Sequence, residues 1–131
     1  MSVTKKYIDF LGDISTFIPQ ERIYTDELRR LAWGTDAGFY RLIPQVVIRS
    51  DNEKEVSELL KCANKHLLPV TFRAAGTSLS GQACTDSVLI MLGEKGWEDN
   101  GISDDKSEIT LQAGILGSQA NAYLAPYGKK I

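Results

Sequence analysis

The stretch Val46–Gln82, VVIRSDNEKEVSELLKCANKHLLPVTFRAAGTSLSGQ, decides the fold that this sequence predicts. It opens with a short run of β-branched residues, which is typical of a buried strand. A helical apolar stripe follows, and we place its start at a capping box formed by Ser50 and Glu53. Residues 68–73 give a second apolar strand. A strand, a helix and a strand within about thirty residues predict a βαβ unit, with two parallel strands joined by a right-handed crossover.

Helical segments are predicted ahead of this unit. Apolar residues recur at helical spacing over residues 7–18, and Pro19 is predicted to stop that helix. A second short helix is predicted after Thr25, whose hydroxyl suits an N-cap position. We therefore divide the chain into an N-terminal helical extension over residues 1–42 and an α/β unit over residues 43–131.

Further elements are predicted after the unit. An aliphatic run at residues 88–92 and an alternating run at residues 108–113 predict two more strands, separated by a polar connection. A last helix carries Leu116, Ala120 and Leu124. The predicted fold class is thus α+β, built around a parallel βαβ unit. No strand follows the last helix, so we expect an incomplete domain.

Composition excludes several classes of function. Fifteen basic against seventeen acidic residues leave a net charge of −2, which argues against general binding of nucleic acid or anionic lipid. The longest aliphatic run, residues 88–92, is too short for a membrane span. A single histidine argues against a histidine metal cluster or a catalytic triad. The two cysteines, Cys62 and Cys84, are interpreted as unpaired thiols of a cytoplasmic protein, since the N-terminus lacks a secretory pattern.

The candidate chemistry lies in the loop RAAGTSLSGQ, residues 73–82, which follows the second strand. Its small residues let the backbone approach a ligand, and successive N–H groups can converge on an anion. Gly76 and Gly81 match the glycine spacing of a Walker A loop, but Gln82 and Ala83 replace its lysine and hydroxyl residue. The loop therefore suits a diphosphate held by backbone amides without magnesium. The alternative is a tight turn that binds nothing.

Family motifs stand in order around this loop. The strand P-x-x-V-V, the helix E-V-x-x-L-L-x-x-A-N and the loop R-x-A-G-T-S-L-S-G-Q fall within Ile43–Ala83. This segment resembles the FAD-binding domain of the vanillyl-alcohol oxidase/para-cresol methylhydroxylase superfamily, in the branch of the glycolate oxidase flavoprotein subunit and D-lactate dehydrogenase. The later ITLQAGILGSQANAYLAPYG resembles the next strand, turn and helix of the family. Upstream, TDAGFYRLIP is similar to long members in which the flavin domain is fused to an iron–sulfur domain.

The resemblance implies FAD bound between two α/β subdomains, with its pyrophosphate on the backbone of residues 74–78 and residues 80–82 close by. Arg73 is expected to contact a phosphate or to pair with a surface carboxylate. Members with covalent flavin often carry a histidine where Thr77 stands here, so the FAD is expected to be non-covalent. The cofactor-binding candidates are Arg73, Ala74, Ala75, Gly76, Thr77, Ser78, Leu79, Ser80, Gly81 and Gln82.

The resemblance also implies an oxidoreductase that takes a hydride from a 2-hydroxy acid, glycolate or D-lactate-like, and passes electrons to an iron–sulfur or quinone acceptor. The substrate-binding and proton-abstracting residues of the family have no matching positions here, so catalytic residues stay unknown and the chain alone is expected to be inactive. Two alternatives stay open. One is a non-catalytic nucleotide-binding module, and the other is an inactive truncated fragment that self-associates into a homo-oligomer.

Other polar residues are given structural roles. Asp36, Tyr40 and Arg41 precede the first strand of the βαβ unit, where packing and turn roles are favoured over contact with a flavin. His66 lies at the end of the amphipathic helix and is expected to cap free carbonyl groups there.

Overall fold

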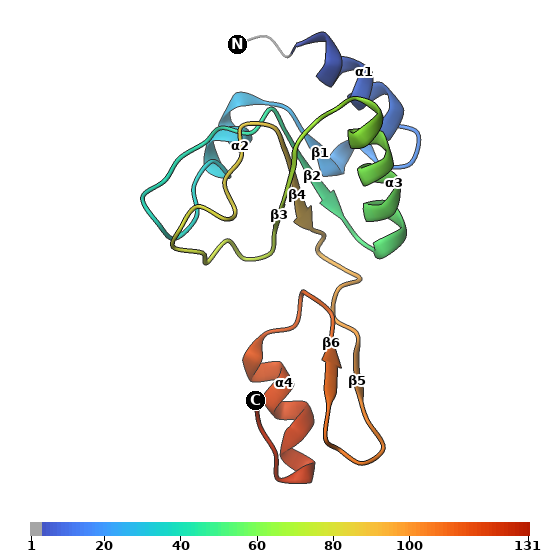
Figure 1. Cartoon of the computed structure of the whole chain (residues 1–131), viewed down its shortest axis with the longest axis vertical. Helices are drawn as coiled ribbons and strands as arrows, with labels where there is room; N and C mark the ends of the chain where they lie inside the picture. The colour runs from blue at the N-terminus through green and yellow to red at the C-terminus, as the bar shows by residue number, and fades with distance from the viewer. Residues whose placement is uncertain (1–3) are drawn as a thin grey trace.

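Two lobes joined by residues 93–99 make up the structure (Figure 1), a computed structural model that describes residues 4–131. The first lobe holds a four-stranded sheet with its helices, and the second holds a two-stranded sheet and one helix. The predicted α+β class with a parallel βαβ unit is confirmed.

Parallel strands form the centre of the first lobe. Strands β2 (Val46–Ser50) and β3 (Val70–Arg73) both run parallel to β4 (Val88–Leu92), which lies between them. The parallel orientation of β2 and β3 is thus confirmed, although they are not neighbours. Strand β1 (Ile23–Tyr24) adds an antiparallel edge to β2. Because β2 and β4 are buried on both faces, they consist of nearly continuous apolar runs.

Two helices cover one face of this sheet. Helices α1 (Lys5–Ile14) and α3 (Glu53–Lys65) lie side by side there (Figure 1). Their apolar residues join the sheet in one core cluster, so the N-terminal extension shares its core with the strands that follow. The largest fully buried members of this cluster are Phe10, Ile14, Ile18, Ile48 and Leu59.

Helix α1 ends earlier than the apolar spacing predicts. The hydroxyls of Ser15 and Thr16 donate to the carbonyl oxygens of Gly12 and Asp13, and these local bonds compete with continuation of the helix. The prediction that Pro19 stops the helix is therefore wrong. The 3₁₀ turn η1 (Gln20–Arg22) then leads into β1.

Both predicted N-caps are displaced. The cap of α3 is Asn52, whose Oδ1 accepts from the N–H of Glu55 at 2.9 Å, because Ser50 is still paired with Leu92 in the sheet. The predicted capping box at Ser50 is therefore wrong. Helix α2 (Glu27–Ala32) is capped by Asp26 rather than by the adjacent Thr25.

His66 ties the two covering helices together. Its Nε2 lies 2.7 Å from Oδ2 of Asp13, and Nζ of Lys65 donates to the same oxygen at 2.8 Å. The expectation that His66 caps carbonyl groups is wrong, because the Asp13 carboxylate lies within its reach. These contacts lower the pKa of Asp13. The hydrogen bond from Lys65 has the larger effect and the one from His66 the smaller.

The second lobe contains a strand that the sequence did not predict. Strands β5 (Asn100–Ile102) and β6 (Ile109–Leu111) form a hairpin, followed by helix α4 (Gly117–Leu124) and the turn η2 (Ala125–Tyr127). Strand β5 falls in the predicted polar connection, since two of its three residues are exposed and carry no strand signal. Strand β6 occupies the middle of the predicted strand.

Candidate functional site

The candidate loop leaves β3 at the carboxyl edge of the parallel sheet, the edge where α/β proteins place ligands. Two of its glycines adopt left-handed backbone conformations, with φ of +72° at Gly76 and +78° at Gly81. A Cβ on Gly76 would overlap the guanidinium of Arg73, and one on Gly81 would touch Tyr40. These glycines let the chain turn closely over neighbouring side chains.

A run of free backbone donors marks this loop. Within residues 4–131, the N–H groups of residues 75–79 donate to no other group of the chain. Residues 75, 77 and 79 are exposed, and residues 76 and 78 are half-buried. Consecutive unpaired N–H groups around a left-handed glycine can surround an anion, so the residues present fit a diphosphate ligand.

Asp36 holds the far end of the loop. Its Oδ2 accepts from the hydroxyl of Ser78 at 2.7 Å and from the N–H of Gly81 at 2.9 Å, while Oδ1 accepts from the N–H of Gly38 at 2.7 Å. The Ser78 hydroxyl, assisted by the two backbone donors, lowers the pKa of the Asp36 carboxyl. The side chain is therefore charged at neutral pH. The expected turn role of Asp36 is confirmed by the bond from Gly38. Its two other bonds come from the candidate loop.

Arg73 lies beneath Gly76 and bonds to the backbone. Its Nη1 donates to the carbonyl oxygen of Thr35 at 2.6 Å and to that of Trp33 at 3.4 Å. Its Nε is buried and has no partner among the described residues. The expected pairing with a surface carboxylate is wrong, because Arg73 forms no ion pair among the described residues and its guanidinium donates to backbone carbonyl oxygens instead. Contact with a phosphate stays a prediction.

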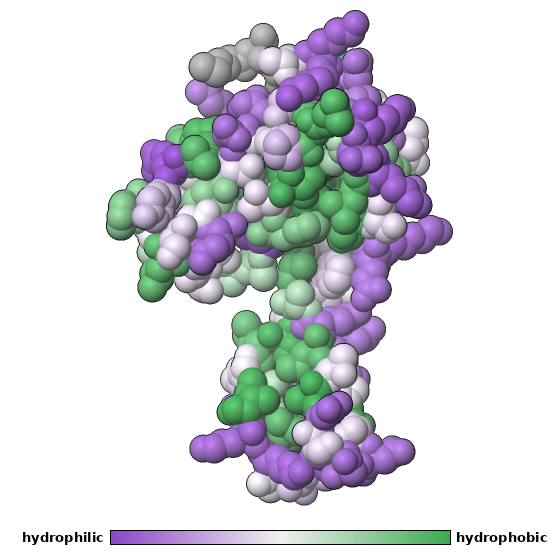
Figure 2. All heavy atoms as spheres, viewed as in Figure 1, coloured by the Kyte–Doolittle hydropathy of each residue, from purple (hydrophilic) through white to green (hydrophobic). Residues whose placement is uncertain are grey.

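An apolar cavity of about 310 Å³ adjoins the start of the loop. It lies at the carboxyl ends of β2, β3 and β4, and it is also lined by Trp97 of the joining segment and by Ala113, which follows β6. Hydrophobic residues also gather on the visible surface of both lobes (Figure 2). The lining includes Phe72, Ala74, Ile90, Met91, Trp97 and Ala113.

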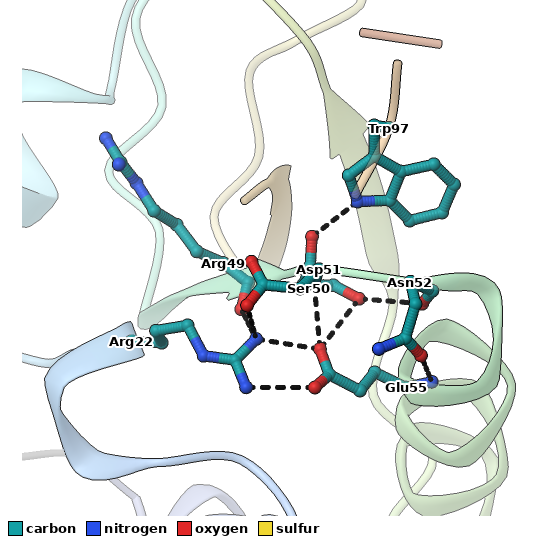
Figure 3. A network of polar contacts seen from close by, with 7 residues as sticks. All are labelled: Arg22, Arg49, Ser50, Asp51, Asn52, Glu55 and Trp97. Atoms are coloured by element: carbon teal, nitrogen blue, oxygen red, sulfur yellow. Dashed lines mark hydrogen bonds and ion pairs between the residues drawn. The ribbon is translucent and has the colours of Figure 1, made fainter. Parts of the chain in front are cut away.

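A polar network fixes the edge of the sheet beside this cavity (Figure 3). The carboxylate of Glu55 accepts two bonds from Arg22, at 2.8 and 2.9 Å, and one from the N–H of Asp51 at 2.8 Å. The Arg22 guanidinium is the main cause of the lowered pKa of Glu55. The indole N–H of Trp97 donates to the carbonyl oxygen of Ser50 at 2.6 Å, which ties the joining segment to the end of β2.

Sequence reasoning missed this network, because Arg22 and Glu55 are 33 positions apart. Cys62 and Cys84 are unpaired, as predicted. No cluster of potential metal ligands occurs within residues 4–131. No helix of that part of the chain is long and apolar enough to cross a membrane.

Curated relatives include several dehydrogenases. D-2-hydroxyglutarate dehydrogenase of Pantoea ananatis is 27% identical over 128 residues, which cover 95% of this chain and 12% of that protein. Glycolate oxidase subunit GlcD of Bacillus subtilis is 30% identical over 89 residues, which cover 66% of this chain and 19% of that protein. D-lactate dehydrogenase of Archaeoglobus fulgidus is 37% identical over 73 residues, which cover 51% of this chain and 16% of that protein. The chain thus spans less than a fifth of the length of these relatives.

Solved structures share the fold. p-Cresol methylhydroxylase superposes on 97% of the chain with a TM-score of 0.77 at 12% identity, over 26% of its own length. An alkyldihydroxyacetonephosphate synthase covers 98% with a TM-score of 0.75 at 16% identity, also over 26% of its length. The family model described as "FAD binding domain" matches residues 44–131, which include the loop and its free N–H groups. The chain therefore belongs to the family of FAD-binding domains.

Proposed function

We propose that this chain forms the pyrophosphate site of a flavin-dependent dehydrogenase, with residues 73–82 around the diphosphate of a non-covalent FAD. The observation that carries the proposal is the run of unpaired N–H groups at residues 75–79. Five neighbouring N–H groups can donate hydrogen bonds to the oxygens of a diphosphate without a metal ion. Thr77 offers no histidine nitrogen for a covalent flavin link.

The residues of this chain would bind and orient the cofactor, and FAD would supply a ring that accepts a hydride. Gly76 lets the backbone approach the phosphates, and Asp36 and Arg73 hold the loop from below. The 310 Å³ cavity could exclude water from an apolar part of the ligand. No residue described here is assigned to substrate chemistry.

We also propose that the substrate is a small 2-hydroxy acid. The support is the set of relatives, which are named for D-2-hydroxyglutarate, glycolate and D-lactate. An iron–sulfur acceptor for the electrons is supported by the resemblance of TDAGFYRLIP to members fused to an iron–sulfur domain, and a quinone is the alternative acceptor. A cytoplasmic location is supported by the two unpaired thiols.

A second candidate is a nucleotide-binding module without catalysis. It is favoured by the same N–H groups, because backbone donors that bind a diphosphate do not distinguish a flavin from another nucleoside. The truncated-fragment alternative is supported by exposed apolar side chains, above all Phe39 at 89% and Leu67 at 82% exposure. Its sign would be a homo-oligomer that forms as concentration rises.

Titration of the purified chain separates these candidates. FAD fluorescence is followed as chain is added, with ADP and riboflavin as competitors and sedimentation to measure self-association. The proposal predicts saturable quenching that ADP reverses and riboflavin does not. Equal affinity for ADP and FAD would favour the nucleotide module. No saturable binding of FAD would overturn the proposal.

A further inference from the structure

The segment of residues 33–42, here called the brace, lies against the candidate loop although the family model begins only at residue 44. The brace is closed on itself. Thr35 and Arg41 form an isolated antiparallel bridge, and the N–H of Leu42 donates to the carbonyl oxygen of Gly34 at 3.0 Å. This closure gives a short segment a defined shape without a helix or strand.

Polar contacts join the brace to both ends of the turn at residues 78–81. The N–H of Ala37 donates to the carbonyl oxygen of Ser78 at 3.0 Å. The Asp36 carboxylate accepts from the hydroxyl of Ser78 and from the N–H of Gly81. One side chain therefore fixes the entry and the exit of this turn.

Close packing reinforces these bonds. A Cβ on Gly38 would lie 2.6 Å from the carbonyl oxygen of Leu79, so the brace backbone rests directly on the loop. On the other side, Arg73 donates to the carbonyl oxygen of Thr35. The brace is thus bonded to the loop at its beginning, through Arg73, and at its end, through Asp36.

We propose that Asp36 is a positioning residue that holds residues 75–79 in the conformation that leaves their N–H groups free for the cofactor diphosphate. This inference rests on the proposed function of the loop. A loop that is already ordered loses less conformational entropy when it binds, so a fixed turn raises affinity without touching the ligand. The hydroxyl of Ser78 and the N–H of Gly81 serve the brace, and they are not assigned to the phosphates.

The charge of Asp36 makes the inference testable against a purely electrostatic role. A carboxylate near an anion site repels the ligand, so neutralising it would strengthen binding if charge were its only effect. If Asp36 acts by holding the loop, Asp36→Asn weakens binding instead. The amide retains one acceptor oxygen, but it cannot accept all three bonds, because its nitrogen is only a donor.

The experiment compares FAD affinity among four variants of the full chain by fluorescence quenching. Asp36→Ala removes all three accepted bonds, Asp36→Asn keeps part of them, and Ser78→Ala removes only the hydroxyl. The matched control is Asp105→Ala, since Asp105 accepts three comparable bonds in the β5–β6 hairpin away from the loop. Urea unfolding of each variant reports whether the sheet stays folded.

Asp36→Ala is expected to weaken FAD binding about tenfold from the loss of two loop bonds, and Ser78→Ala about threefold from the loss of one. Asp36→Asn is expected to weaken it about threefold, because its amide oxygen can keep both loop bonds but a neutral acceptor makes weaker bonds than a carboxylate and the bond from Gly38 is lost. Asp105→Ala should bind as the wild type does.

Partial rescue by Asn marks a positioning role, whereas tighter binding by Asp36→Asn overturns the inference. Unchanged binding in Asp36→Ala overturns it as well. If Asp36→Ala unfolds, Ser78→Ala decides, because it leaves the carboxylate in place. If the wild-type chain does not bind FAD, this contradicts the proposed function of the loop and not only the role of Asp36.

Discussion

Replacing Gly76 by alanine tests the link between backbone conformation and cofactor binding. At φ of +72°, any residue with a Cβ is strained by about 1–2 kcal/mol. The new methyl group would also displace the Arg73 guanidinium, which can move only by giving up its bonds to the carbonyl oxygens of Thr35 and Trp33. Losing that anchoring adds about 1 kcal/mol.

Gly128→Ala separates these two costs. Gly128 has a similar φ of +65°, but nothing lies within 4 Å of a Cβ placed there. It therefore carries the conformational cost alone, about 1–2 kcal/mol, whereas Gly76→Ala should lower the free energy of unfolding by roughly 2–3 kcal/mol.

Urea unfolding measures both values, and FAD titration measures the effect on the site. Gly76→Ala should weaken FAD binding at least about tenfold, because 1.4 kcal/mol of lost interaction corresponds to that factor. Gly128→Ala should leave binding unchanged. Equal destabilisation by the two substitutions would refute the role given to Arg73, and normal FAD binding by Gly76→Ala would refute the role given to the loop backbone.

Three further predictions concern the scaffold. Glu55→Gln should lower the free energy of unfolding by about 1–3 kcal/mol in urea, because it weakens the bidentate pair with Arg22, and an unchanged midpoint would contradict this. Folding lowers the pKa values of Glu55 and Asp13 from their ordinary values of 4.5 and 3.8. Their contribution to stability is therefore complete above those ordinary values and is lost as pH falls through the lower values of the folded state. Thermal unfolding should accordingly occur at a lower temperature at about pH 3 than at about pH 6. Gly12→Ala should stabilise the chain by about 0.5–1 kcal/mol, since Gly12 is exposed in α1 with open space around it, and any loss of stability would show that the glycine is needed there.

Local patterns were sufficient to predict the main elements of the first lobe. The aliphatic runs of β2 and β4 and the apolar stripe of α3 carry their own periodicity, so strand, helix and parallel orientation follow from sequence. The candidate loop is predicted because glycines and hydroxyl residues follow a predicted strand. The insertion of β4 between β2 and β3 has no local signal, since strand order is decided by packing between distant segments.

Contacts over long separations account for the rest. Asp36 and Gly81 are 45 positions apart, so the brace could not be assigned to the loop from spacing. The N-caps were misplaced by one or two residues, because adjacent Thr25 and Asp26 are both acceptable caps and only the structure shows which one accepts a bond. The termination of α1 depended on hydroxyl bonds of Ser15 and Thr16, which the apolar spacing does not encode.

The central claim is that backbone N–H groups of residues 75–79 bind a diphosphate, and amide NMR of the labelled chain during ADP titration tests it most directly. The account predicts saturable shifts of the amide signals of residues 75–79, with little change at Gly12 or Gly128, which lie outside the loop. Repetition with adenosine, which lacks the phosphates, should abolish these shifts. Saturable shifts confined to other residues, or equal shifts with adenosine, would contradict the account.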